Sequence, residues 1–107
     1  MKRKVFLDTS FILNSLKYGI DIFQELRRIL DFNFDVYIVD KTLKELKGKK
    51  FEKIALRILE KVKVLETKSD KNVDNLLLEL KDAIIATQDK ALKEKLKNGR
   101  IPVITIR

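Results

Sequence analysis

Among its 107 residues the sequence contains no cysteine and no histidine. Without cysteine there is no disulfide framework, no thiolate metal site and no thiol nucleophile. Without histidine there is no imidazole ligand, no Ser–His or Cys–His nucleophile pair and no imidazole general base. Any catalysis must therefore use carboxylates, lysines, hydroxyls or a metal ion that prefers oxygen ligands.

Glycine and long apolar runs are also scarce. The three glycines are Gly19, Gly48 and Gly99, so the chain has neither a G-x-G-x-x-G fingerprint nor a P-loop, and we expect no nucleotide cofactor. No apolar run approaches the ~20 residues that cross a bilayer, and no signal-peptide pattern opens the chain. We therefore expect a soluble protein of the cytoplasm with no membrane partner.

Positive charge, in contrast, is in excess. The chain has 24 lysines and arginines against 16 acidic residues, which gives a net charge of +8 at pH 7. Such a surface favours a polyanionic partner, and a nucleic acid is the leading candidate. A Lys/Glu-rich surface of a thermophilic protein would explain the same composition, together with the absent cysteine, and the two explanations are compatible.

Apolar segments divide the chain without a linker, repeat or low-complexity tract. Short apolar runs predict strands at 3–7, 35–39, 62–66, 83–87 and 102–106. Helical periodicity predicts helices at 20–32, 41–47, 50–61, 72–80 and 90–97, the second of them capped by Asp40. Strands that alternate with helices pair in parallel through right-handed crossovers. The pattern predicts a single α/β domain over residues 1–107.

Acidic residues lie where such a fold builds its sites. Asp8 follows the first strand and Asp89 follows the fourth, and sites in open α/β sheets lie at the carboxyl ends of the strands. Glu45 lies on the helix after the second strand, and Asp74 lies in the first turn of the helix before the fourth strand. If the first and fourth strands are neighbours, these four carboxylates form an all-oxygen site. Mg²⁺ or Mn²⁺ prefers such ligands more than zinc does.

Each acid also has an ordinary structural explanation. Asp8 and Asp89 could cap the helical turns that follow them. Asp74 could interact with the dipole of its own helix, and Glu45 could pair with a lysine four residues away on either side. Taken singly, the structural roles are favoured, so the metal site depends on the set of acids and on their order.

Lysines gather beside two of these acids. Those around Glu45 and those after Asp89 are Lys44, Lys47, Lys49, Lys50, Lys90, Lys93 and Lys97. They could bind the phosphates of RNA, or they could form an ordinary solvated face. Phe11 could stack on a base, although packing in the core is the favoured role for it.

Four segments of the chain resemble motifs of the PIN-domain nucleases. They are Leu7-Asp8-Thr9-Ser10-Phe11-Ile12-Leu13, Leu43-Lys44-Glu45-Leu46, Val73-Asp74-Asn75 and Ile85-Ala86-Thr87-Gln88-Asp89-Lys90-Ala91-Leu92. The resemblance covers almost the whole chain. The last segment, with the basic helix after it, is similar to small archaeal members related to eukaryotic ribosomal-RNA-processing endonucleases.

The resemblance implies a three-layer α/β/α fold with a five-stranded parallel sheet in the order 3-2-1-4-5. It implies Mg²⁺- or Mn²⁺-dependent hydrolysis of RNA phosphodiester bonds, in RNA processing or as a toxin of the VapC type. The family's acidic quartet carries over to Asp8, Glu45, Asp74 and Asp89, as catalytic and metal-binding residues. Supporting hydroxyls carry over to Thr9, Ser10 and Thr87. The implied partners are RNA, an antitoxin or a ribosome-assembly protein, and a second copy of the chain.

Two departures from the family pattern keep other interpretations open. Asn75 stands where the related group has a second acid, and the span from Asp74 to Asp89 is shorter than usual. The shorter span could move Asp74 out of the site, and Asp70 is then the substitute. The main alternative is a non-catalytic PIN-like RNA-binding or scaffold protein. A receiver-like phospho-acceptor domain on a similar sheet is the third interpretation.

Overall fold

The computed structural model describes residues 2–106, which form a three-layer α/β/α fold around one sheet. The strands are β1 (Arg3–Leu7), β2 (Phe34–Val39), β3 (Lys63–Leu65), β4 (Ala83–Ala86) and β5 (Val103–Ile104). All neighbouring strands are parallel, and their order is β3-β2-β1-β4-β5. The predicted fold class and strand order are confirmed. A receiver-like sheet has the order 2-1-3-4-5, so the third interpretation is wrong.

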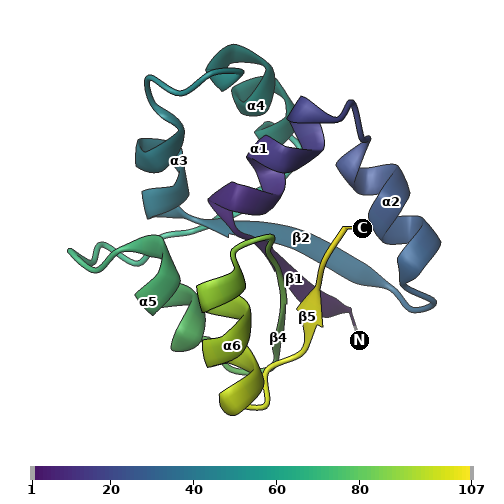
Figure 1. Cartoon of the computed structure of the whole chain (residues 1–107), viewed down its shortest axis with the longest axis vertical. Coiled ribbons are helices and arrows are strands. Elements are labelled where there is room, and N and C mark those ends of the chain that lie inside the picture. Colours follow the sequence, from purple (N-terminus) through teal and green to yellow (C-terminus); the bar gives the residue numbers. More distant parts are fainter. Residues whose placement is uncertain (1, 107) are drawn as a thin grey trace.

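Helices cover both faces of this sheet (Figure 1). They are α1 (Thr9–Lys17), α2 (Ile22–Ile29), α3 (Asp40–Leu46), α4 (Glu52–Leu59), α5 (Val73–Leu78) and α6 (Lys90–Asn98). The first four helices share one apolar cluster with the sheet, and α5 and α6 share a second cluster on the opposite face. Side chains of β1 alternate accordingly: Val5 and Leu7 enter the first cluster and Phe6 enters the second.

The helix α1 was not predicted. Its buried residues are Thr9, Phe11, Ile12 and Ser15, so polar side chains interrupt the apolar face that a helical period needs. The hydroxyl of Ser15 is nevertheless satisfied inside the helix, because it donates to the carbonyl of Phe11 at 2.8 Å. Tertiary packing therefore makes a helix of a segment whose own pattern does not indicate one.

The last predicted strand is shorter than expected. Only Val103 and Ile104 pair with β4, while the prediction covered 102–106. Beyond Ile104, the side chain of Gln88 makes the hydrogen bonds that a neighbouring strand would make. Its Oε1 accepts hydrogen bonds from the Thr105 hydroxyl and the Ile106 amide, both at 2.7 Å, and its Nε2 donates to the Ile106 carbonyl at 2.9 Å.

Asp40 was predicted to cap α3 from outside, and this prediction is wrong. Val39 is the N-cap and Asp40 is the first helical residue. The Asp40 carboxylate accepts hydrogen bonds from the Thr67 hydroxyl at 2.6 Å and from the amides of Thr67 and Lys68 at 3.0 Å. These bonds, led by that of the Thr67 hydroxyl, lower the pKa of Asp40 to about 2. Asp40 thus fastens the loop after β3 to the start of α3.

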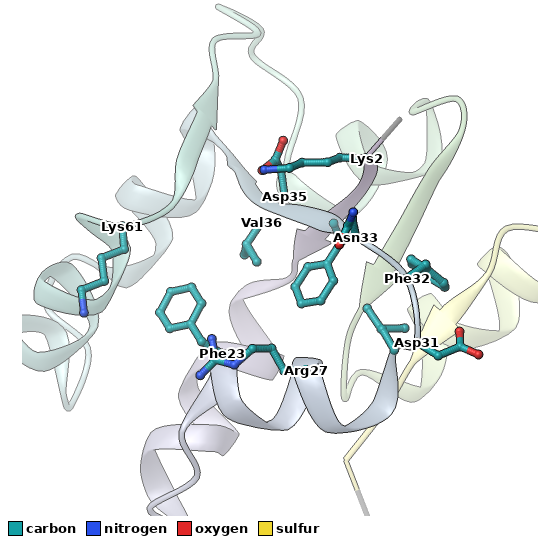
Figure 2. A pocket seen from close by; sticks show the side chains of 11 residues that line it. Lys2, Phe23, Arg27, Asp31, Phe32, Asn33, Asp35, Val36 and Lys61 are labelled. Carbon is teal, nitrogen blue, oxygen red and sulfur yellow. The ribbon is translucent and has the colours of Figure 1, made fainter.

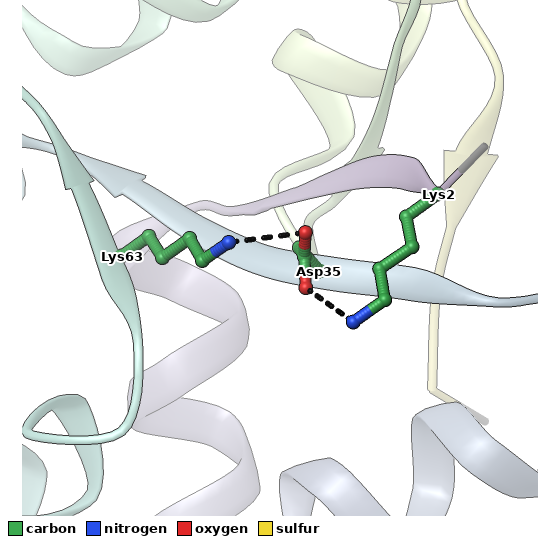
Figure 3. Close-up of polar contacts among 3 residues, drawn as sticks. All are labelled: Lys2, Asp35 and Lys63. Carbon is green, nitrogen blue, oxygen red and sulfur yellow. Dashed lines mark hydrogen bonds and ion pairs between the residues drawn. The ribbon is translucent and has the colours of Figure 1, made fainter.

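The amino edge of the sheet carries its own ion pairs and pocket. Asp35 lies between Lys63 at 3.1 Å and Lys2 at 3.5 Å (Figure 3). The hydrogen bond from Lys63 is the main cause of the lowered pKa of Asp35. A pocket of about 650 Å³ lies beside it, with Phe23 and Arg27 of α2 on its far wall (Figure 2). This edge is opposite to the one at which β1 runs into Asp8.

Candidate active site at the carboxyl edge of the sheet

Asp8 is buried at the end of the central strand, with 3% of its surface exposed. It is the N-cap residue of α1, but its side chain makes no capping hydrogen bond. Instead, its Oδ2 accepts hydrogen bonds from the hydroxyls of Ser10 at 2.5 Å and Thr87 at 2.8 Å. The capping explanation of the Asp8 carboxylate is therefore wrong. Its Oδ1 receives no hydrogen bond within residues 2–106.

The Ser10 and Thr87 hydroxyls join the ends of β1 and β4. Their oxygens are 3.1 Å apart. The Ser10 hydroxyl also accepts from the Gln88 amide at 3.0 Å, and the Thr87 hydroxyl accepts from the Asp89 amide at 3.1 Å. The two hydroxyls therefore fix both the Asp8 carboxylate and the backbone that carries Asp89.

Asp89 is a helix cap and a neighbour of this network at once. Its Oδ1 accepts from the Leu92 amide at 3.1 Å, which caps α6 as the ordinary explanation required. Its Oδ2 receives no hydrogen bond in the described part of the chain. The cap holds the carboxylate in one orientation and leaves one oxygen available to another ligand.

Glu45 reaches the same edge from α3. Its Oε1 accepts a hydrogen bond of 2.5 Å from the hydroxyl of Thr9, which is itself buried. Across residues 2–106, the ion pairs do not include Glu45, so its predicted pairing with a lysine is not found. Thr9 follows Asp8 directly, and its hydroxyl therefore ties Glu45 to the residue beside the buried acid.

Asp74 is half-buried in the first turn of α5, close enough to the other acids to be affected by them. Burial raises the pKa of its carboxyl, and the negative charges of Asp8, Asp89 and Glu45 raise it further, while Lys95 opposes them. The shorter span before Asp89 therefore does not move Asp74 away from this edge. The side chain that caps α5 belongs to Asn72, which accepts from the amide of the residue three positions on.

Asp70, the substitute candidate, lies elsewhere. It is exposed in the loop between β3 and α5, where it lines a separate hollow of about 210 Å³ with Asp40 and Lys44. It is not among the charges that raise the pKa of Asp74. The structure brings Asp8, Glu45 and Asp89 toward Asp74, whereas Asp70 lies beside the first residues of α3.

The donor set fits a hard divalent cation. It consists of carboxylates and hydroxyls, and Asp8 and Asp89 each keep one oxygen without a hydrogen bond. Within residues 2–106, no three acidic side chains have their oxygens gathered tightly enough to hold one ion. The acids thus lie at one edge of the sheet and affect one another electrostatically, but their oxygens do not meet at a single point. Carboxylates repel one another at short range, so a bound cation is needed to bring their oxygens closer together.

Two lysines near this edge were not among the predicted site residues. Lys95 of α6 opposes the burial and the charges that raise the pKa of Asp74, whereas the prediction named Lys90, Lys93 and Lys97 of the same helix. Lys17 ends α1 and lines a pocket that also contains Ser10. Recognising a helix over 9–17 would have found Lys17, because positions seven apart share one helical face.

Comparison with known proteins agrees with this geometry. Residues 5–107 match the family described as "PIN like domain". The chain belongs to the PIN-domain family. Ribonuclease VapC4 of Methanocaldococcus jannaschii is 33% identical over an alignment of 120 residues, and the alignment covers 97% of this chain and 90% of that protein. The solved structure of the PIN domain endonuclease Utp24 is 30% identical with a TM-score of 0.86, covering 97% of this chain and 85% of that one. This PIN-domain membership supports a nuclease function.

None of the helices in residues 2–106 is both long enough and apolar enough to cross a membrane.

Proposed function

We propose that this PIN-domain protein is a divalent-metal-dependent endoribonuclease that hydrolyses RNA phosphodiester bonds. The observation that carries the proposal is the set of four acids from separate elements at the carboxyl edge: hydroxyls hold Asp8 and Glu45 there, and burial and the charges of Asp8, Asp89 and Glu45 raise the pKa of Asp74. Structural ion pairs do not explain such a cluster, because like charges destabilise a fold until a bound cation neutralises them. The similarity to a ribonuclease and to an endonuclease supports the same activity.

Mg²⁺ or Mn²⁺ would activate a water, neutralise the phosphate and stabilise the leaving oxygen. We assign Asp8 and Asp89 as its principal ligands, because each has one oxygen fixed by donors and one left over. Glu45 and Asp74 would bind a second ion or orient the attacking water. This assignment gives catalytic and metal-binding roles to the same four acids.

Three hydroxyls support the acids in this proposal. Ser10 and Thr87 hold Asp8, and Thr9 holds Glu45, so each carboxylate keeps one orientation. A ligand that is already oriented loses little conformational freedom on binding, which favours both affinity and rate. The roles of Thr9, Ser10 and Thr87 are therefore positioning roles.

RNA is the proposed substrate, and the lysines around the acids are its proposed contacts. Lys44, Lys47, Lys49, Lys50, Lys90 and Lys93 are all accessible at least in part. We also propose an antitoxin or a ribosome-assembly protein as partner, in the cytoplasm. A homodimer is a further proposal, supported by Ile54 and Leu56 of α4, whose exposed fractions are 51% and 40%.

The deciding experiment is cleavage of a labelled single-stranded RNA with Mn²⁺. We expect the wild type to cut and both Asp8→Asn and Asp89→Asn to lose at least 100-fold in rate, because each removes a principal ligand. Asp70→Asn is the matched control, since Asp70 lies outside the cluster, and it should cut like the wild type.

The non-catalytic alternative predicts a different result. A PIN-like RNA-binding or scaffold protein would bind the RNA tightly and leave it intact with Mn²⁺. The same alternative would follow if the two Asn variants cut as fast as the wild type, because the activity would then belong to a contaminant.

A further inference from the structure

A further pocket opens between α1 and the turn that joins α3 to α4. Its volume is about 320 Å³, at the lower end of the roughly 300–1,000 Å³ of ligand pockets. It is lined by Ser10, Leu13, Asn14, Lys17, Lys49, Lys50 and Phe51. The Ser10 hydroxyl that donates to Asp8 is part of this wall. The pocket therefore begins at the network that holds the principal acid.

One face of α1 forms half of the pocket. Ser10, Asn14 and Lys17 lie at helical spacings of four and three residues, with the apolar Leu13 between them. Along about 10 Å of helix the wall thus offers a hydroxyl, an apolar side chain, an amide and an ammonium group. An apolar surface flanked by an amide and a cation matches the chemistry of a nucleotide, which has a flat base, polar base edges and a phosphate.

The lysines of the pocket are not engaged by acids. Across residues 2–106, none of the ion pairs involves Lys17, Lys49 or Lys50. All three are exposed. Their charges are therefore available to the phosphates of a strand that crosses the acidic edge.

Phe51 forms the other wall, in an unusual backbone conformation. Its φ is +72°, in the left-handed region that a bulky aromatic residue rarely adopts. The turn around it is fixed, because the Lys49 amide donates to the Leu46 carbonyl at 3.0 Å and the Gly48 amide donates to the Glu52 carboxylate at 2.9 Å. Such a conformation persists only where the surrounding structure holds it, and it is concentrated at ligand sites.

The Phe51 side chain is not a core residue. It is only half-buried and belongs to neither apolar cluster. The Lys50 ammonium lies 5.3 Å from the centre of its ring, a cation–π distance. Aromatic rings beside basic side chains are the usual platforms for the bases of single-stranded nucleic acids.

We propose that this pocket binds one nucleotide of a single-stranded RNA, next to the phosphate that the acids would cleave. Phe51 stacks on the base, Asn14 hydrogen-bonds to its edge, and Lys17 and Lys49 contact the flanking phosphates. The cleavage position relative to this nucleotide rests on the proposed nuclease function. The binding of RNA in the pocket does not, because it needs no catalysis.

The test is binding of a fluorescein-labelled single-stranded RNA of 12 nucleotides to the full chain, in chelator so that no cleavage intervenes. We expect Phe51→Leu to raise the Kd about tenfold or more, because leucine keeps the bulk and loses the stacking surface. Phe32→Leu is the matched control, since Phe32 is exposed to 37% far from the acids, and its Kd should equal that of the wild type. Circular dichroism and the Tm establish that each variant is folded.

A second variant and a second readout test the pocket without altering the turn that contains Phe51. Asn14→Ala probes the same pocket from α1 and should also raise the Kd. An RNA that carries 5-iodouridine should crosslink to the peptide containing Phe51 on irradiation. Unchanged Kd values for both variants, with crosslinks elsewhere, would overturn the proposal; a protein segment would then be the better occupant.

The two proposals fail in distinguishable ways. Loss of binding in Phe51→Leu together with no cleavage by the wild type would keep the nucleotide pocket and reject the nuclease. Metal-dependent cleavage with unaffected binding in Phe51→Leu would keep the nuclease and reject the pocket.

Discussion

At the scale of single residues, hydrogen-bond partners separate a structural acid from a site acid. Asp8 stands where a helix cap would stand, yet within residues 2–106 its carboxylate accepts only from the hydroxyls of Ser10 and Thr87. Asp40 is the opposite case, because four donors from its surroundings satisfy its two oxygens. A carboxylate with oxygen to spare beside other acids is the one suited to bind a cation.

Asp74→Asn should stabilise the protein in chelator and weaken its response to metal. The substitution removes a carboxylate whose pKa is raised by burial and by Asp8, Asp89 and Glu45, so repulsion falls. We expect the Tm in chelator to rise by a few degrees. In Mn²⁺ at 100 times its Kd, the wild type should gain about 2.7 kcal/mol of stability, and the variant less at the same concentration.

The control for this prediction is Asp31→Asn, because Asp31 is exposed at the opposite edge of the sheet. It should reproduce the wild type in both conditions. Equal melting curves of the wild type in Mn²⁺ and in chelator would contradict a metal site at the carboxyl edge.

Asp40 should contribute to the stability of the fold, and this contribution should be lost at acid pH. Its folded pKa is about 2 against an ordinary value of 3.8, mainly because the Thr67 hydroxyl donates to the charged form. A depressed carboxyl pKa stabilises the fold above the unfolded value, and this contribution is lost as pH falls from about 3.8 to about 2. Urea unfolding of the wild type and Asp40→Asn should therefore differ at pH 5 and converge near pH 2. A difference that stays constant over this range would contradict the assignment.

At the scale of elements, loops and side chains complete what the short strands leave unfinished. β5 has two residues, and the Gln88 side chain continues its role by pairing with Thr105 and Ile106. Gln88 also links this edge to the site, because its backbone amide donates to the Ser10 hydroxyl. Thr105 and Ile106 are thus anchored to the same loop that carries Thr87 and Asp89.

Gln88→Ala should release the segment after β5. It removes three partly buried hydrogen bonds, and we expect the free energy of unfolding to fall by about 1–3 kcal/mol. Urea titration measures this loss, and faster amide exchange at Ile106 locates it. Gln24→Ala, on the exposed face of α2, is the control and should change neither. An unchanged exchange rate at Ile106 in Gln88→Ala would show that the segment is held by other contacts.

At the scale of the whole molecule, the two edges of the sheet have different chemistry. The carboxyl edge gathers acids whose charges add to burial in raising the pKa of Asp74, while the amino edge pairs Asp35 with Lys2 and Lys63. Most of the lysines and arginines that carry the excess of positive charge are exposed. A basic surface around an acidic centre attracts a polyanion and presents it to the acids.

RNA binding should accordingly weaken steeply as salt rises, because each neutralised phosphate releases counterions. We expect Lys49→Gln to reduce the slope of log K against log salt by about 0.7, the value for one single-strand phosphate contact. Lys81→Gln is the matched control, since Lys81 is exposed just before β4, and its slope should stay unchanged. Affinity that does not depend on salt in the wild type would reject the lysines as phosphate contacts.

The local pattern of the chain determined the sheet and half of the candidate site. Apolar runs such as Val5–Leu7 and Ala83–Ala86 predict buried parallel strands on their own; Asp8 follows the first run directly, and Asp89 follows the second after two residues. Their place at one edge then depends only on strand order, which the resemblance to the PIN family supplied. These features are local, because a strand buried on both faces leaves a continuous apolar signal.

The tertiary structure alone decided the rest. It made a helix of 9–17, and it brought Asp74 into the field of the other acids while leaving Asp70 outside. It also placed Phe51 and Lys49 opposite the α1 face that carries Asn14. These outcomes depend on contacts between segments distant in the chain, such as the bond from Thr87 to Asp8, which are 79 residues apart. Spacing along a chain does not encode such contacts, because packing of the two apolar clusters sets the distances between elements.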